Sequence, residues 1–340
     1  MTFLPIANRE LRVAARKRST FWLRVTSALI GLVIGCACMM LASIGGLPTP
    51  GFGSALFGIL TWLSLAAALM AGIFFTSDCL SEEKREGSLG FLFLTDLHGY
   101  DVVAGKLFAT SLRGLFALLA LLPILAITLL MGGVTGLQFW KTALALLNAL
   151  FCSLAAGLFV SSISLDSQKA MGATFLLLFL LVAAGPFIDI FYSRMHGAPF
   201  VPRASLSSPG YLFTIANDYG RSPYWSALLV NQAMAWGFFV MCSFLVPRTW
   251  QQTGGSTIST PRGWVYAWKY GGRKRRERIR RKLLDRDAIV WLACRERWQS
   301  LGIWIIAMIA LAGVVASAIG LPQEAWMLWR FISSLFLFAF

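Results

Sequence analysis

Long apolar runs constrain the fold of this chain more than any other feature of its sequence. Of its 340 residues, 57% are hydrophobic and only 13% are charged. Runs of about 20 apolar residues, the length that a helix needs to cross a bilayer, recur along the chain. They lack the alternation of polar and apolar residues that is typical of membrane β-barrel strands. The sequence therefore predicts an all-α, polytopic membrane protein.

Six of these runs precede the strongly basic part of the chain, and turn-forming or polar segments separate them. They cover about residues 25–47, 53–76, 107–131, 139–163, 170–192 and 225–246. Residues 193–224, between the last two runs, are rich in proline and polar side chains, which predicts a polar loop without an apolar re-entrant hairpin. A seventh run covers about residues 301–321, and an eighth begins near Trp326 and is still short when the sequence ends.

Basic residues predict the orientation of the chain in the membrane. The segment before the first run carries six Arg or Lys residues, which places the N-terminus in the cytoplasm under the positive-inside rule. Counting six runs then places residues 78–106 inside, residues 193–224 outside and residues 247–297 inside. Eight of the ten residues 273–282 are basic, so the linker lies on the side that the rule favours.

The same basic linker has two interpretations. Its charge is suited to nucleic acid, or to the anionic lipid surface next to a membrane span. Its place between spans favours anionic lipid and gives no reason to expect nucleic acid.

Residues 1–24 show a helical pattern of their own. Apolar side chains fall on one arc, and Arg9, Arg12 and Arg16 fall on the opposite arc. Together with Trp22 they predict an amphipathic helix in the membrane interface, anchored by these three arginines and the tryptophan. A positively charged flank before a first span is a compatible alternative.

A charged and then amphipathic segment lies between the second and third runs. Its charges are Glu82, Glu83, Lys84, Arg85 and Glu86. After Gly87, the residues Leu89, Leu92, Phe93 and Leu97 have the spacing of one helical face. The pattern predicts a short surface helix over about residues 78–99, with Gly99 as a stop, Asp101 as a cap of the next helix, and a partner outside the membrane. The alternative is a solvated segment held by pairs such as Glu82–Arg85.

Motifs for catalysis are missing from the sequence. The stretch GYDVVAGK at residues 99–106 has the wrong glycine spacing for a phosphate-binding loop and no Ser or Thr after its Lys. The six cysteines form no C-x-x-C pair, and there are only two histidines. Asp189, the one acid near a span interior, is predicted to be interfacial, which disfavours a proton-coupled carrier. We expect no enzyme activity, no metal site and no cofactor bound by this chain.

The basic N-terminal helix, the six runs and the sequence SEEKREGSLGFLFLTDLHGYDVVAGKL between the second and third runs together resemble the ABC-2 type permeases. These are the membrane subunits of ATP-binding-cassette exporters. The resemblance covers about residues 1–247, and residues 81–89 are its most specific part. It implies a six-helix transmembrane unit over residues 25–247, whose coupling helix, about residues 78–99, seats in a groove of a separate cytoplasmic ATPase subunit.

The resemblance also implies roles for individual residues of the coupling helix. Glu82, Glu83, Arg85 and Glu86 would make the polar contacts with the ATPase subunit. Gly87 would allow the turn into the apolar stripe that begins at Leu89. ATP would be used by the partner subunit and not by this chain.

The function implied is export of an unidentified substrate across a bacterial plasma (inner) membrane by a multi-pass protein with a cytoplasmic N-terminus. A second permease subunit, identical or related, would complete the path. The chain departs from the family in adding a basic cytoplasmic linker, residues 248–298, and one or two further spans, residues 299–340. The alternative class is a non-transporting polytopic membrane scaffold whose basic linker binds lipid or a partner.

Overall fold

The computed structural model describes residues 12, 18–44, 52–87, 98–196, 201–217 and 223–249. The chain divides into two compact units, Met1–Thr253 and Gly254–Phe340, and all of the described residues belong to the first. The predictions for most of the N-terminal amphipathic helix, for residues 250–298 of the linker and for the spans after it lie outside the described residues.

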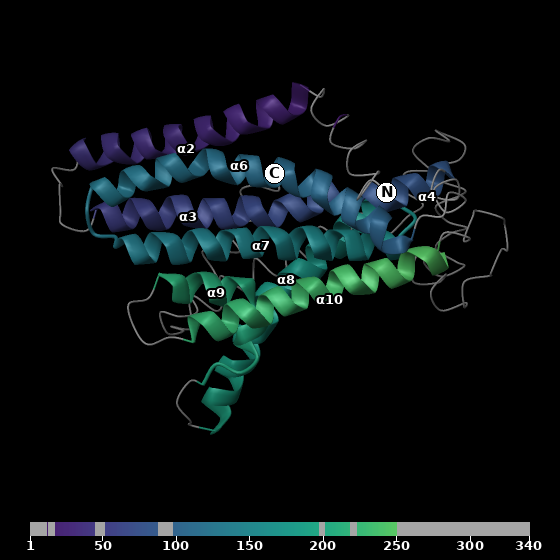
Figure 1. The fold of residues 1–340 in the computed structure, drawn as a ribbon. Helices are drawn as coiled ribbons and strands as arrows, with labels where there is room; N and C mark the ends of the chain where they lie inside the picture. Colours follow the sequence, from purple (N-terminus) through teal and green to yellow (C-terminus); the bar gives the residue numbers. More distant parts are fainter. Residues whose placement is uncertain are drawn as a thin grey trace, which may run out of the picture. The chain divides into compact units, whose positions relative to one another are not determined.

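All regular secondary structure in the described ranges is helical. The elements are α2 (Arg18–Ile44), α3 (Phe52–Ala71), the π-helical turn η1 (Gly72–Thr76), α4 (Cys79–Glu86), α6 (Gly99–Leu130), α7 (Gly136–Ile163), α8 (Ser167–His196), the 3₁₀ turn η2 (Ser205–Ser207), α9 (Pro209–Ala216) and α10 (Tyr224–Thr249). The long helices form a bundle in which α7 contacts α3, α6, α8 and α10 (Figure 1).

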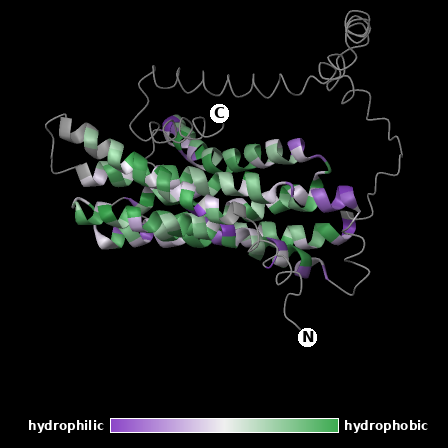
Figure 2. Cartoon of the chain, turned by 90° about the horizontal axis from the view of Figure 1, so that it is seen from above, coloured by the Kyte–Doolittle hydropathy of each residue, from purple (hydrophilic) through white to green (hydrophobic). Residues whose placement is uncertain are grey.

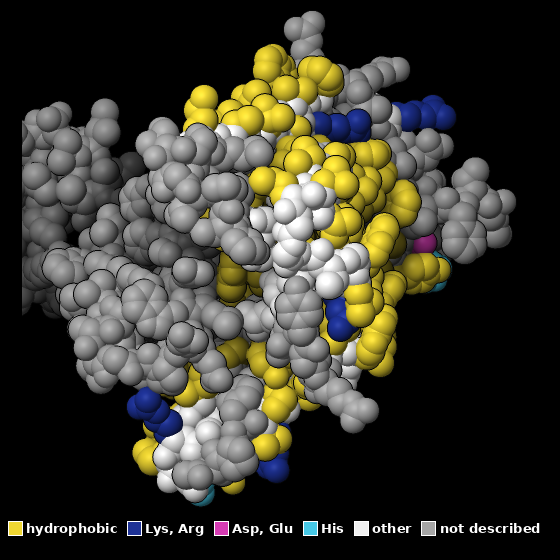
Figure 3. All heavy atoms as spheres, turned by 90° about the vertical axis from the view of Figure 1, so that its left-hand side faces the viewer, with side chains coloured by type: hydrophobic (Ala, Val, Ile, Leu, Met, Phe, Trp, Pro, Cys, Tyr) yellow, Lys and Arg dark blue, Asp and Glu magenta, His cyan; other side chains and the backbone are white. Residues whose placement is uncertain are grey.

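Five helical runs in the described ranges are long and apolar enough to cross a bilayer, and they fit a multi-pass, all-α membrane protein. These are Gly53–Glu86, Gly99–Leu130, Gly136–Ile163, Ser167–His196 and Tyr224–Arg248. The first predicted span falls in α2, a continuous helix of 27 residues. Hydrophobic side chains cover much of the described surface in Figure 3.

The boundary predicted after residue 24 does not coincide with a helix end. α2 begins at Arg18 and continues without a break to Ile44. Trp22 and Arg24 therefore lie in the same helix as the first predicted span, and the side chain of Trp22 is exposed. The helix continues past Arg24, the last basic residue before the apolar run, because residues 18–30 contain no proline or glycine.

Glycines allow η1 and α7 to approach each other closely. A Cβ atom on Gly157 of α7 would lie 2.1 Å from Thr76 Oγ1 and 2.5 Å from the carbonyl oxygen of Gly72. A Cβ atom on Gly72 would lie 2.1 Å from the carbonyl oxygen of Ser153. Small residues are the usual device for bringing membrane helices into backbone contact. The π-helical turn is thus fixed against the central helix of the bundle.

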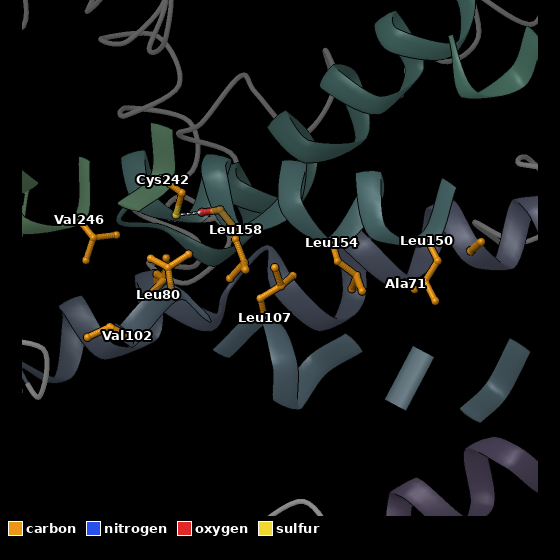
Figure 4. Packing of buried hydrophobic residues seen from close by; sticks show 11 residues of the cluster. Ala71, Leu80, Val102, Leu107, Leu150, Leu154, Leu158, Cys242 and Val246 are labelled. Atoms are coloured by element: carbon orange, nitrogen blue, oxygen red, sulfur yellow. Dashed lines mark hydrogen bonds between the residues drawn. The ribbon is translucent and has the colours of Figure 1, made fainter. Parts of the chain in front are cut away.

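A cluster of buried side chains joins five elements at the end of the bundle where α4 lies. Ala71 of α3 belongs to this cluster, in which Leu80 of α4 and Val102 of α6 meet Leu158 of α7 and Cys242 and Val246 of α10 (Figure 4). The last five of these side chains are the most deeply buried and are completely inaccessible to solvent. The short helix α4 is therefore packed onto the bundle by its apolar residue and is not a detached surface helix.

The prediction that residues 193–224 form only a polar loop is wrong. This segment contains η2 and the helix α9, whose Leu212 and Phe213 are fully buried. Ser208 begins α9 by accepting a hydrogen bond from the backbone N–H of Tyr211, and its hydroxyl donates to the carbonyl of Val182 in α8. Eight residues are too few to register as a span, so the apolar content of α9 is hidden among the surrounding prolines and polar residues.

Asp189 of α8 organises the start of this segment, and its predicted place at the membrane interface stays a prediction. Only 8% of the residue is exposed. Its Oδ2 accepts hydrogen bonds from the N–H groups of Arg203 and Ser205, at 2.9 and 2.7 Å, and its Oδ1 from the N–H of Ala204 at 3.1 Å. The Ser205 hydroxyl donates a fourth, at 2.6 Å. The carboxylate serves backbone groups that the polar loop would otherwise leave unpaired.

We expect Asp189→Asn to destabilise the protein by about 2–3 kcal/mol, since an amide replaces one of the two accepting oxygens with a donor and removes the charge. Thermal unfolding of the purified chain in detergent measures the effect. Asp166→Asn is the matched control, because Asp166 is exposed and pairs only with Lys169 at the surface, where such pairs contribute less than about 1 kcal/mol. Equal losses in the two variants would contradict the structural role of Asp189.

Candidate functional site

The helix α4 projects beyond the apolar part of the bundle. The helical run Gly53–Glu86 has 34 residues, whereas a span needs only about 20. α3 and η1 make up its apolar part, and α4 carries the charged residues at its end. Figure 2 shows hydrophilic residues gathered toward this end of the bundle. α4 is thus a polar extension of a membrane helix.

A serine of α7 caps the start of α4. The backbone N–H groups of Leu80 and Ser81 donate to Ser161 Oγ at 2.9 and 3.0 Å, and Ser161 is completely buried. The first N–H groups of a helix have no partner within it, and a side-chain oxygen normally supplies one. Here that oxygen comes from another helix, so the position of α4 depends on α7.

Two charged side chains of α4 point into the protein. Glu83 Oε1 lies 2.8 Å from Lys106 Nζ of α6, and only 16% and 13% of these side chains are exposed. Lys84 Nζ donates to the carbonyl oxygen of Ser162 at the end of α7. In this structure Glu83 forms an internal ion pair that ties α4 to α6, and its role as a partner contact stays a prediction.

Arg85 and Asp78 form a two-pronged ion pair along α4. Arg85 Nη1 and Nη2 each lie 3.1 Å from one oxygen of Asp78, and Ser81 Oγ donates to Asp78 Oδ1 at 2.6 Å. Burial raises the pKa of Asp78, but the hydrogen bonds from Arg85 and Ser81 outweigh it and hold the pKa below its usual value. Arg85 also donates to the carbonyl of Leu165 at 3.2 Å, and its own side chain stays accessible at the surface.

The exposed face of α4 is acidic. Glu82 and Glu86 are both exposed, and residues four apart lie on the same side of a helix. Of the predicted coupling residues, these two carboxylates and the partly accessible guanidinium of Arg85 are presented to solvent. Leu89 and the rest of the predicted apolar stripe lie outside the described residues.

Gly87, and not Gly99, ends this helix. Gly87 has φ +72°, a left-handed conformation that glycine adopts without strain, and its N–H donates to the carbonyl of Lys84. Gly99 is the first residue of α6, preceded by the N-cap His98, whose N–H donates to Asp101 Oδ2 at 3.2 Å. The predicted stop at Gly99 is therefore wrong, while Asp101 does cap the next helix as predicted.

A close contact explains why glycine occurs at the first position of α6. A Cβ atom on Gly99 would lie 2.6 Å from both Pro247 Cγ and the carbonyl oxygen of Ser243 in α10. The sequence signal that indicated a helix stop is in fact a packing requirement between α6 and α10.

The predicted interfacial anchors are only partly described. Arg12 is an exposed helical residue, and Trp22 is exposed on α2. Arg9 and Arg16 lie outside the described residues. In the described ranges, no group of three or more His, Cys, Asp or Glu residues could hold a metal ion.

Sequence reasoning missed the residues that hold α4 in place. Ser161, Ser162 and Lys106 supply its cap and its internal partners. One signal was available in the sequence. The pair Ser161-Ser162 lies at the end of the fourth apolar run, on the same predicted side of the membrane as residues 78–106. A polar pair in that position is suited to bind a neighbouring helix end.

A scan against protein-family models found no match to this chain, and a search of curated proteins found none either.

Proposed function

We propose that this chain is the permease subunit of an ABC-2 type transporter and that α4 is its coupling helix. The observation that carries the proposal is that some charged side chains of α4 bind the bundle while others face solvent. Glu83, Lys84 and the helix N-terminus bind α6 and α7, while Glu82 and Glu86 face solvent. This arrangement suits a helix that is attached to the membrane bundle and is bound by a separate protein. It occurs in the segment whose sequence resembles the family's coupling segment.

In this proposal, the partner is a cytoplasmic ATPase with a groove whose basic residues complement Glu82 and Glu86. The partner binds and hydrolyses ATP. Movement of its groove displaces α4, and the displacement reaches α6 through Lys106 and α7 through Ser161. Partner binding shifts the arrangement of the spans only if the partner binds one arrangement more tightly than another. The rigid attachment of α4 to α6 and α7 links the position of α4 to the arrangement of the spans.

The rest of the assembly follows from the same proposal. The end of the bundle that carries α4 faces the cytoplasm of a bacterial cell, the spans lie in its inner membrane, and a second permease subunit completes the path for an exported substrate.

Reversing the exposed acidic face is the test of the proposal. We expect Glu82→Lys/Glu86→Lys to abolish co-purification of ATP hydrolysis with the tagged full-length chain from its native membranes, because like charges would then face the partner's groove. Unfolding temperature in detergent should stay within about 2 °C of wild type, since exposed charges contribute little to stability.

Arg194→Glu is the control for this test. It also reverses an exposed charge, near the opposite end of the bundle at the end of α8, and should leave the co-purified ATP hydrolysis unchanged. If the double variant retains full ATP hydrolysis, or if wild-type material never contains any, the coupling role of α4 is refuted and the scaffold alternative gains support.

A further inference from the structure

Two arginines, Arg24 of α2 and Arg113 of α6, lie near the contact between these two helices. The guanidinium carbon of Arg24 in α2 lies 3.8 Å from the ring centroid of Phe116 in α6. One turn further along α2, Ser27 Oγ donates to the carbonyl of Ala117 at 3.4 Å. The two helices therefore run side by side in the same direction, and Arg24 lies on the face that contacts α6.

Arg113 belongs to the same face of α6. Phe116 and Ala117 follow it by three and four residues, which places all three side chains on one side of the helix. The Nε of Arg113 is buried and has no hydrogen-bond partner among the described residues. A buried donor without a partner is rare in native proteins, so this N–H is available to a bound group.

Neither helix provides a carboxylate to neutralise these two charges. α2 contains no acidic residue, and Asp101, the only acid in α6, lies at its first turn, where it accepts from the N–H of His98. Arg24 is exposed, so it remains accessible to a ligand from the membrane while stacking on Phe116. The site thus presents two positive charges and the Nε–H donor of Arg113, which has no partner among the described residues.

The depth of the two arginines matches the lipid headgroups. α6 ends at Leu130, and counting back about 20 residues for the hydrocarbon core reaches residue 111, next to Arg113. The same count back from Ile44, the end of α2, reaches Arg24. Long basic side chains at this level extend toward the headgroups, where lipid phosphates lie.

We propose that Arg24 and Arg113 form a binding site for the phosphate of an anionic phospholipid, in the leaflet on the α4 side of the membrane. Two guanidinium groups can bind one phosphate through paired N–H···O bonds, and basic sites between membrane helices recognise anionic headgroups in this way. The site contains no residue of the basic linker and does not depend on the proposed transport function.

Lipid binding to the purified full-length chain tests the site. The probes are dioleoylphosphatidylglycerol and dioleoylphosphatidylcholine in dodecyl maltoside micelles, with bound lipid counted by native mass spectrometry and the unfolding temperature measured in parallel. We expect the wild type to retain phosphatidylglycerol preferentially and to be stabilised by it. Arg113→Gln and Arg24→Gln should each weaken phosphatidylglycerol binding about tenfold, the loss of one charge-assisted contact, and Arg113→Lys should weaken it less.

Arg194→Gln is the matched control, because Arg194 is an exposed arginine at the end of α8, outside both the site and the basic linker, and its lipid binding should equal that of the wild type. Unchanged phosphatidylglycerol binding by both Arg24→Gln and Arg113→Gln would overturn the proposal. The proposal would also be overturned if Arg113→Gln lowered the unfolding temperature equally in the two lipids, because the partner of Arg113 would then be a group of the protein and not the lipid phosphate. Displacement of the lipid by millimolar inorganic phosphate would assign the site to a free anion instead.

Discussion

Glu83→Lys is expected to destabilise the protein by about 3–5 kcal/mol, the cost of removing one partner from a largely buried ion pair. The pair joins Glu83 of α4 to Lys106 of α6 at 2.8 Å, and both side chains are mostly inaccessible to solvent. The variant would place two ammonium groups together in that space. Thermal unfolding of the purified chain in detergent is the measurement.

The swapped variant Glu83→Lys/Lys106→Glu shows whether the pair itself is responsible. We expect the second change to restore most of the stability lost in the first, because opposite charges again face each other. Glu86→Lys is the control for a charge reversal on the exposed face of α4, and should cost less than about 1 kcal/mol. A double variant as unstable as Glu83→Lys alone would contradict the pairing.

This result bears on how the function of α4 is tested. A loss of partner binding in Glu83→Lys would follow from disruption of α4 as readily as from loss of a contact. Only Glu82 and Glu86 offer charges that can be reversed without disturbing the attachment of α4 to the bundle. The two kinds of variant therefore separate the internal role of α4 from its external one.

The helices of the bundle follow directly from the apolar runs. A bilayer-spanning helix needs about 20 apolar residues, so runs of that length predict both the type and the approximate place of each helix. The ends were less accurate, because helices continue past the apolar region wherever the polar sequence permits. α6, for example, begins at Gly99 and not near residue 107, since His98 and Asp101 form a cap there.

The helix α9 could not be predicted from apolar content alone. Its eight residues are held by tertiary contacts: Phe213 packs edge-on against Trp62 of α3, with ring centroids 4.9 Å apart, and Leu212 and Ala216 belong to a buried cluster with Ala145 of α7. These partners are distant in sequence. A short helix that is stable only through such contacts leaves little local signal.

The charged run of α4 was recognised as a candidate site, but its division into internal and external charges was not. Adjacent residues on a helix point about 100° apart, so Glu82 and Glu83 face different surroundings. Which surroundings are protein and which are solvent depends on α6 and α7, and their placement follows from packing of the whole bundle. The sequence therefore predicted the segment correctly as charged and helical, while the geometry assigned Glu83 to α6.

Gly157→Ala is the second change with a large expected effect. The added Cβ would lie 2.1 Å from Thr76 Oγ1 and 2.5 Å from the backbone oxygen of Gly72, and backbone cannot move aside as a flexible side chain can. We expect a loss of about 1–3 kcal/mol or more from overpacking, measured by thermal unfolding in detergent.

Gly58→Ala in α3 is the control, because a Cβ there meets nothing within 4 Å, and the better helix propensity of alanine should leave stability equal or higher. Equal stability of the two variants would show that the backbones of η1 and α7 are not in contact. Since η1 connects α3 to α4, separating it from α7 would also move the N–H groups of Leu80 and Ser81 away from Ser161. Gly157→Ala is therefore expected to weaken partner binding together with stability, whereas Glu82→Lys/Glu86→Lys is expected to weaken partner binding alone.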